Sequence, residues 1–187
     1  FIFVFILSYL ERFVNMLKSD FYYDLPKELI AQHPADKRDG SRLLILDKKT
    51  GEMQHKHFYD IVDYLHPGDC LILNDTKVIP ARIYGKRNDT GAVVEFLLLK
   101  DKGNDCWEAL AGPGKKARAG HAFTFGDGVL NGVVDAVLEN GNRIIDFHYQ
   151  GIFLEILNEL GEMPLPHYIK EHLEDPDRYQ TVYCREP

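Results

Sequence analysis

Cysteines are scarce in this chain of 187 residues. Cys70, Cys106 and Cys184 are an odd number of widely spaced residues without a C-x-x-C pair. That spacing argues against a zinc ribbon, a dithiol redox centre and a disulfide framework. We therefore expect three reduced thiols in a cytoplasmic protein.

The sequence also lacks a long hydrophobic run. Its apolar opening, "FIFVFIL", ends at Ser8, far short of the ~20 residues of a membrane-spanning helix, and it has neither the basic leader nor the cleavage site of a signal peptide. No membrane association is expected. Met16 opens "MLKSDFYYDLP" and has the character of a natural start, so residues 1–15 are predicted to be a non-native leader. The chain stops at a proline without a closing element, and we expect truncation there as well.

Common site motifs are missing too. The sequence contains no G-x-x-x-x-G-K-[ST], no G-x-G-x-x-G after a strand, no H-E-x-x-H and no G-x-S-x-G. His55 and His57 would share one face of a strand and reach one metal ion, but no third ligand lies nearby in the sequence. An exposed strand face is the favoured interpretation, and no metal is expected.

A formal net charge of −7 excludes a wholly basic nucleic-acid binder but leaves room for local basic patches. Two stretches are basic, residues 76–88 and "GPGKKARAG" at 112–120. If folding brings them together they form a phosphate-binding surface; the alternative is a solvated rim of loop and strand. The candidate RNA-binding residues are Lys77, Lys86, Arg87, Lys115, Lys116 and Arg118.

The pattern of elements changes twice along the chain. Residues 16–69 mix helix and strand: a helix is predicted at 24–32, two strands around the turn at Thr50 and Gly51, and a short helix at 58–65. Residues 70–150 read as about six short strands, beginning with Cys70–Leu73 and Val78–Tyr84, separated by turns rich in Gly, Asn and Asp. Such spacing indicates a small closed β-barrel. Residues 151–161 predict an amphipathic helix, and 162–187 return to helix and loop.

Five blocks of sequence carry a specific resemblance. In order they are "RDGSRLLILD" (38–47), "GDCLILNDTKVIPARIYG" (68–85), "GAVVEFLLL" (91–99), "GEMPLPHYI" (161–169) and "DRYQTVY" (177–183). Together they closely resemble the S-adenosylmethionine:tRNA ribosyltransferase-isomerase family of queuosine biosynthesis, from about Met16 to the end of the chain. Two positions depart from the usual pattern, His167 and Cys184, and the family continues beyond "REP".

The resemblance implies a fold and an activity. The fold would be α+β, with a small six-stranded antiparallel β-barrel at 70–150 inserted into an incomplete α/β domain formed by 16–69 and 151–187. The activity would move the ribosyl moiety of S-adenosylmethionine, as co-substrate, onto the aminomethyl-deazaguanine wobble base of tRNA and isomerise it. The products would be epoxyqueuosine-tRNA, adenine and methionine. We expect a cytoplasmic monomer with precursor tRNA as its partner, inactive as this fragment alone.

That chemistry requires proton transfer next to a sulfonium and at the departing adenine, and groups that hold a cation. By the resemblance, the catalytic candidates are Asp75 and Glu95. The substrate-binding candidates are Asp39, Ser41, Arg42, Asn74, Thr76, Arg82, Arg178, Tyr179, Gln180 and Tyr183.

Each candidate has a structural alternative. Asp75, like Asn74 and Thr76, fits an Asx-type turn, and Glu95 fits the outward face of a strand. Arg82 fits a surface ion pair, and Tyr179 with Tyr183 fits a helical stripe. "MPLP" (163–166) fits a rigid linker. Two other classes of protein also stay open: a non-catalytic RNA-binding barrel, and an interaction fragment with neither activity.

Overall fold

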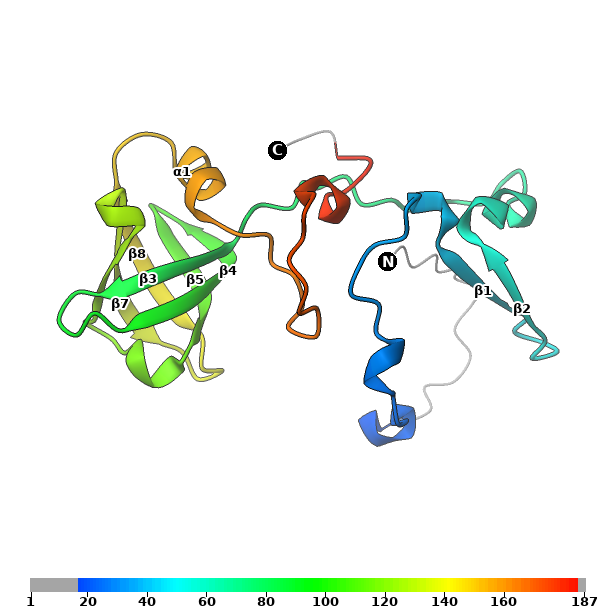
Figure 1. The fold of residues 1–187 in the computed structure, drawn as a ribbon, viewed down its shortest axis with the longest axis horizontal. Helices are drawn as coiled ribbons and strands as arrows, with labels where there is room; N and C mark the ends of the chain where they lie inside the picture. The colour runs from blue at the N-terminus through cyan, green and yellow to red at the C-terminus, as the bar shows by residue number, and fades with distance from the viewer. Residues whose placement is uncertain (1–16, 185–187) are drawn as a thin grey trace. The chain divides into compact units, whose positions relative to one another are not determined.

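The computed structural model describes residues 17–184, so the predicted leader at 1–15 lies outside the described residues. The chain forms two compact units (Figure 1). The first comprises the residues up to Asn74 together with His167–Glu174. The second, which we call the barrel unit, comprises Asp75–Pro166 together with the residues from Asp175 on. The chain thus leaves the first unit after Asn74 and returns to it before the end.

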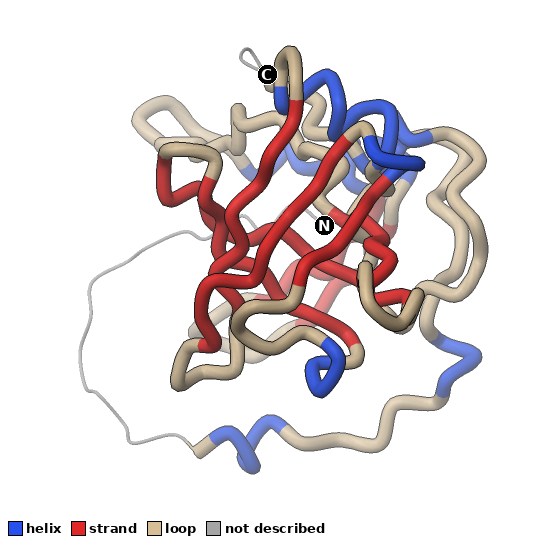
Figure 2. Tube along the Cα trace, turned by 90° about the vertical axis from the view of Figure 1, so that its left-hand side faces the viewer, coloured by secondary structure: helices blue, strands red, loops and turns tan. Residues whose placement is uncertain are grey.

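The barrel unit contains a closed barrel of six antiparallel strands, which confirms the predicted barrel and the α+β fold class. Neighbours around the barrel follow the order β3-β4-β5-β8-β7-β6, and β3 closes the ring by pairing with β6. All strands of the described residues are drawn in red in Figure 2. The strands are β3 (Arg82–Arg87), β4 (Val93–Gly103), β5 (Cys106–Gly112), β6 (Ala122–Phe125), β7 (Leu130–Val137) and β8 (Arg143–Tyr149).

The barrel interior is apolar because alternate residues of each strand point inward. In β4, for example, Val94, Phe96 and Leu98 are buried. Phe96 packs edge-on against Phe123 and Phe125, with ring centroids 4.9 and 5.7 Å apart. Edge-to-face pairs of this kind add to the stabilisation from burial alone. The core is therefore continuous around the ring and gives the strands a fixed register.

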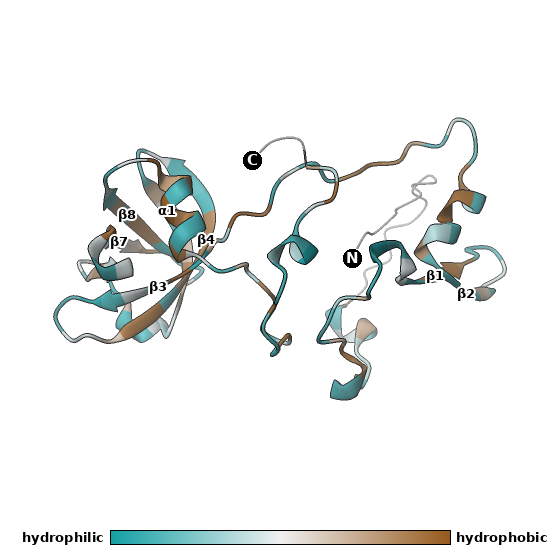
Figure 3. Cartoon of the chain, turned by 45° about the horizontal axis from the view of Figure 1, so that its top comes forward, coloured by the Kyte–Doolittle hydropathy of each residue, from teal (hydrophilic) through white to brown (hydrophobic). Residues whose placement is uncertain are grey.

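The helix α1 (Phe153–Leu160) follows β8 and confirms the helix predicted at 151–161. Ile156 and Leu157 are buried, and the Phe153 ring lies 5.6 Å from Trp107 and 5.2 Å from Tyr149. In Figure 3 the helix carries both hydrophobic and hydrophilic residues. Its apolar face packs on the barrel, which fixes the point where residues 161–166 start.

The first unit contains a two-stranded antiparallel sheet, as predicted. Its strands are β1 (Arg42–Leu46) and β2 (Met53–His57), joined by a turn with Gly51 at φ 73°. The Asp47 carboxylate accepts hydrogen bonds from the backbone of Thr50 and Lys49, which lowers the pKa of Asp47. Both strands are largely exposed.

Two predicted elements of the first half are wrong. Residues 24–32 were expected to be a helix, but only a single 3-10 turn forms there, at Lys27–Leu29. A helix that short cannot offset its nucleation cost without a packed face, and its residues are mostly exposed. Residues 70–73 were expected to be a strand, but no strand forms there, and Leu71 and Ile72 are 45% and 79% exposed. The next predicted strand, Val78–Tyr84, is shifted and begins at Arg82.

The remaining helical segments are short 3-10 helices. The helix predicted at 58–65 is one of them. They are η1 (Lys18–Phe21), η2 (Lys27–Leu29), η3 (Arg38–Gly40), η4 (Phe58–Tyr64), η5 (Gly114–Lys116), η6 (Gly126–Gly128) and η7 (Pro176–Tyr179). Within residues 17–184, no helix has both the length and the apolar character of a membrane span. Cys70, Cys106 and Cys184 are free thiols.

Candidate functional site

The segment that leads into β3 is held by the side chain of Gln180. The Gln180 carboxamide accepts a hydrogen bond from the Val78 N–H at 2.7 Å and donates one to the Val78 carbonyl at 3.0 Å. Its Oε1 also accepts from the Thr181 N–H at 3.0 Å. One side chain thus satisfies both backbone groups of Val78, as a neighbouring strand would. We call this arrangement the Gln180 clamp.

Four side chains at the start of β3 form a second group, the Arg82 cluster: Arg82, Tyr84, Glu95 and Glu162. Arg82 Nε lies 3.2 Å from Glu95 Oε1, and only 11% of the Arg82 side chain is exposed. The guanidinium also donates to the Leu165 carbonyl at 2.9 Å and the Met163 carbonyl at 3.5 Å. The ion-pair alternative for Arg82 is therefore what the structure shows, and the same side chain fastens residues 163–165 to the barrel.

Tyr84 and Glu162 complete this cluster. The Tyr84 hydroxyl donates to Glu162 Oε2 at 3.4 Å, and Glu95 is the residue that pairs with Tyr84 across the sheet. Desolvation raises the pKa of Tyr84, and the charges of Glu162 and Glu95 raise it further while Arg82 lowers it. Two carboxylates and one guanidinium thus surround a phenol that stays protonated at neutral pH. The local formal charge is negative, which suits a cationic ligand.

Residues 161–166 are bound closely to the strand entry. Arg82 and Glu162 exchange backbone hydrogen bonds of 3.2 and 2.8 Å. A Cβ at Gly161 would lie 2.0 Å from the Pro80 carbonyl oxygen, so the approach requires glycine. The Tyr179 hydroxyl donates to the Pro164 carbonyl at 3.4 Å. The stretch read as a linker is thus an ordered part of the barrel unit.

The structure therefore brings together four of the five sequence blocks. Val78 and Arg82 come from the second block, Glu95 from the third, Glu162 to Leu165 from the fourth, and Tyr179 and Gln180 from the fifth. All of these contacts lie within the barrel unit. Residues separated by about 100 positions thus meet on the outside of one barrel.

The other predicted site residues, the catalytic candidate Asp75 among them, lie outside the Gln180 clamp and the Arg82 cluster as defined above. Asp75, Thr76 and Tyr183 are exposed residues of the barrel unit, and Arg178 is half-buried in η7. Tyr179 ends η7 and Tyr183 lies beyond it, so the two do not form a helical stripe. Asn74, Asp39, Ser41 and Arg42 belong to the first unit. Ser41 Oγ donates to the Arg38 carbonyl, which closes the η3 turn.

The candidate RNA-binding residues fall into two sets. Arg87 is neutralised by Asp89, with Nε and Oδ1 2.6 Å apart, and this contact lowers the pKa of Asp89. Lys77 is exposed in the segment before β3, and Lys86 is exposed near the end of β3. Lys115, Lys116 and Arg118 are exposed on the loop between β5 and β6, which follows Gly112, the last residue of β5 and the partner of Glu95 in β4. The loop thus begins beside the Arg82 cluster.

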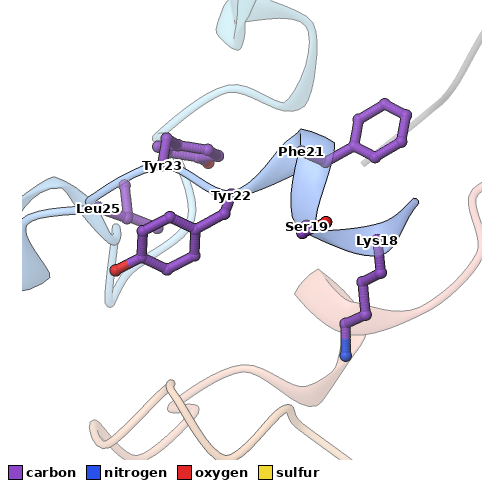
Figure 4. A pocket seen from close by; sticks show the side chains of 6 residues that line it. All are labelled: Lys18, Ser19, Phe21, Tyr22, Tyr23 and Leu25. Carbon is purple, nitrogen blue, oxygen red and sulfur yellow. The ribbon is translucent and has the colours of Figure 1, made fainter. Parts of the chain in front are cut away.

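Metal-binding side chains and a surface hollow were compared with the predicted residues. Residues 17–184 contain no group of three His, Cys, Asp or Glu side chains able to hold a metal ion. His55 and His57 are exposed on β2, and the His57 ring stacks on Tyr59 at 5.2 Å. A hollow in the first unit is lined by side chains that point in different directions (Figure 4). They are Lys18, Ser19, Phe21, Tyr22, Tyr23 and Leu25, none of which is a predicted site residue.

Sequence reasoning missed Tyr84, Glu162 and Arg143. Tyr84 could have been predicted, because Arg82, Tyr84 and Lys86 are two residues apart and therefore share one face of β3. Glu162 lies in a recognised block, but nothing in the sequence pairs it with β3. Arg143, which donates hydrogen bonds to the Gly114 and Ala117 carbonyls, is a single arginine after a turn, and no local sequence pattern predicts these contacts.

A barrel unit with an ordered polar cluster on its outer face, in an α+β chain, is a class shared by many proteins. Comparisons with known proteins narrow it. A family model described as "Queuosine biosynthesis protein" matches residues 18–187. A curated relative from Acetivibrio thermocellus, named S-adenosylmethionine:tRNA ribosyltransferase-isomerase, is 56% identical over 170 residues, or 91% of this chain and 50% of the relative.

A solved structure is also similar, S-adenosylmethionine tRNA ribosyltransferase from Thermotoga maritima. It is 40% identical, with a TM-score of 0.39 over 76% of this chain and 48% of that one. The chain belongs to the queuosine biosynthesis protein family. It spans about half the length of the relatives that it matches.

Proposed function

We propose that this chain is part of an enzyme that transfers the ribosyl moiety of S-adenosylmethionine to the aminomethyl-deazaguanine wobble base of tRNA and isomerises it. Epoxyqueuosine-tRNA, adenine and methionine are the products. The observation that carries the proposal is the identity of 56% with a ribosyltransferase-isomerase over 91% of the chain. The proposed enzyme acts as a monomer in the cytoplasm.

The Arg82 cluster supports the binding half of this proposal. Glu95 and Glu162 place two carboxylates beside the Tyr84 ring. The carboxylates attract a sulfonium by their charge, and the face of the aromatic ring attracts it as well. The attraction strengthens when a bound substrate excludes water. Arg82, Tyr179 and Gln180 hold the backbone around these groups, and Arg82 remains a candidate for binding a substrate carboxylate or phosphate.

The proton transfers fall to Asp75 and Glu95. One proton leaves the carbon next to the sulfonium, and one reaches adenine as it departs; a positioned carboxyl group serves either step. Asp75 is exposed and lies three residues before the Gln180 clamp at Val78. Substrate binding in the proposed enzyme further involves Asp39, Ser41, Arg42, Asn74, Thr76, Arg178 and Tyr183.

A non-catalytic RNA-binding barrel is the second candidate, favoured by the exposed basic side chains of the loop at 112–120. It requires tRNA affinity but no reaction with S-adenosylmethionine. The discriminating experiment incubates S-adenosylmethionine with precursor tRNA and protein, and follows adenine by chromatography. Two proteins are compared: the 187-residue chain, and the same chain joined to the remaining half of the Acetivibrio relative.

We expect adenine from the joined protein, dependent on precursor tRNA, and none from the 187-residue chain. Binding of tRNA without adenine in both would establish the second candidate. Neither binding nor adenine would leave an interaction fragment. Adenine from the 187-residue chain at the rate of the joined protein would show that this half is active alone.

A further inference from the structure

Arg143, the first residue of β8, is bonded to the basic loop between β5 and β6. Its Nε donates to the Ala117 carbonyl at 2.9 Å, and its Nη2 donates to the Gly114 carbonyl at 2.6 Å. Its Nη1 donates to the Gly141 carbonyl in the turn before β8. All three nitrogens of the guanidinium thus contact main-chain oxygens, two of them in the loop that carries Lys115, Lys116 and Arg118.

Other contacts hold the same loop in one conformation. The Ala117 side chain is fully buried, and the Gly120 N–H donates to the Val134 carbonyl at 2.7 Å. The Arg118 N–H donates to His121 Nδ1 at 3.1 Å. Lys115, Lys116 and Arg118 remain exposed throughout. The loop is therefore anchored by its backbone while its three basic side chains point into solvent.

Within residues 17–184, the basic side chains of this loop and of Arg143 form no ion pair. Ion pairs within residues 17–184 include those of His66, Arg82, Arg87 and Lys102. None of those pairs includes Lys115, Lys116, Arg118 or Arg143. Holding like charges together in one loop is unfavourable by itself and becomes favourable when a polyanion such as an RNA backbone is bound.

We infer that Arg143 is a positioning residue that presets the loop at 113–120 for contact with RNA phosphates. The inference rests on the proposed tRNA contact of Lys115, Lys116 and Arg118. Arginine is required because its planar fork reaches carbonyl oxygens in three directions, which a lysine ammonium at the end of a flexible stem does not reproduce. A loop fixed before binding loses less conformational entropy when RNA binds.

Arg143→Lys provides the central test, because it keeps the charge and removes the fork. Binding of a tRNA transcript is measured by fluorescence anisotropy over a salt titration, and hydrogen exchange follows the Lys116, Ala117 and His121 amides. We expect Arg143→Lys to weaken tRNA binding roughly tenfold and to speed exchange of these amides. Lys102→Ala is the matched control, since it removes a barrel-surface charge that is paired with Glu108.

Gly114→Ala is a second variant that keeps every charge. Its Cβ would lie 2.8 Å from Arg143 Nη2 and must displace the guanidinium. We expect it to loosen the loop and weaken tRNA binding as Arg143→Lys does, with the thermal transition of the barrel retained. This variant keeps the inference testable if replacement of Arg143 hinders folding.

The triple variant Lys115→Ala, Lys116→Ala, Arg118→Ala separates the inference from the proposed function. It should lower the salt slope by roughly one unit for each lost phosphate contact, and adding Arg143→Lys should weaken binding no further. If the triple variant binds tRNA as the wild type does, the proposed RNA surface is wrong and this inference falls with it. If the triple variant is weak but Arg143→Lys binds normally or leaves exchange unchanged, only the positioning role of Arg143 is wrong.

Discussion

Asp75 and Glu95, the two carboxylates proposed for proton transfer, have different surroundings. Glu95 is 29% exposed and accepts a hydrogen bond from Arg82, so its replacement disturbs a partly buried pair. Asp75 is exposed. A surface carboxylate is replaced at little cost in stability. Asp75 is therefore the position at which chemistry and folding are separated most cleanly.

We predict that Asp75→Asn, in the chain joined to the rest of a relative, lowers the rate of adenine release by about two to four orders of magnitude. The amide keeps the shape of the side chain and removes its charge. The thermal transition should stay within experimental error of the wild type. Glu95→Gln is the comparison variant, and it should lower stability as well as rate because Arg82 keeps an acceptor but loses the negative charge of its partner.

Near-normal turnover by Asp75→Asn would refute a catalytic role for Asp75. Loss of activity only in proportion to loss of folded protein would favour the turn-forming alternative instead.

Cys106 supplies a second prediction at this scale. Burial raises the pKa of Cys106 from 9.0 to about 11, and a hydrogen bond and the charge of Asp146 contribute to the shift. Because the thiolate is the reactive form, iodoacetamide at pH 8 should modify the exposed Cys70 well before Cys106. Peptide mass spectrometry measures the two rates. Equal rates would contradict the burial of this thiol.

The same shift has a consequence for stability. The folded barrel holds the Cys106 proton more tightly than the unfolded chain does. This contribution is complete below pH 9.0 and is lost as the pH rises through about 11. The alkaline fall in the free energy of unfolding should therefore be smaller in Cys106→Ala than in the wild type.

Among the elements, the segment that leads into β3 is held at Val78 by a side chain. The Gln180 clamp satisfies both backbone groups of Val78, which are partly buried. A buried backbone group without a partner costs about 1–3 kcal/mol. The clamp thus helps to order the polar stretch before β3.

We predict that Gln180→Ala lowers the free energy of unfolding of the barrel unit by about 1–3 kcal/mol. Gln180→Glu should also lower it, because the acceptor for Val78 and Thr181 is kept but the donor is replaced by a charged oxygen that faces the Val78 carbonyl oxygen. The fluorescence of Trp107, the one tryptophan of the chain, reports unfolding of this unit. Gln150→Ala, at an exposed glutamine, is the control. An unchanged transition in Gln180→Ala would remove the clamp from this account.

The accuracy of the sequence-based predictions followed how local each signal was. The β1–β2 hairpin, a barrel of about six strands and α1 were predicted because alternation, turn residues and a helical period lie within short windows. Residues 70–73 have the composition of a strand, but no strand pairs with them within residues 17–184. Residues 24–32 have helix signals but lack a packed face. Composition therefore predicted secondary structure only where a segment had a strand to pair with or a surface to pack on.

The sequence predicted which residues belong to the candidate site, but not which of them contact one another. Arg82, Glu95, Tyr179 and Gln180 were named from the resemblance, and the structure places them in one unit. Their contacts connect residues 13 to 102 positions apart, as in Arg82 with Glu95 and Val78 with Gln180. No pattern in a single sequence encodes such pairings, which explains why Glu162 and Arg143 were missed.

For the whole molecule, the contrast between the two units predicts unequal stability. The buried core residues all lie in the barrel unit, whereas the first unit leaves Tyr22, Leu29, Leu46 and Val62 each more than 60% exposed. In the 187-residue chain, hydrogen exchange should be slow for amides of β3 to β8 and fast for those of β1 and β2. Uniform protection across both units would refute this two-unit behaviour.

The central claim is that S-adenosylmethionine supplies the group added to tRNA. It is tested most directly by mass spectrometry of the nucleosides of precursor tRNA after incubation with the joined protein and S-adenosylmethionine labelled with carbon-13 in the ribose. We predict that the labelled ribosyl carbons appear on the deazaguanine nucleoside in one-to-one ratio with released adenine. An unlabelled nucleoside, or release of adenine without modification of the tRNA, would contradict the account.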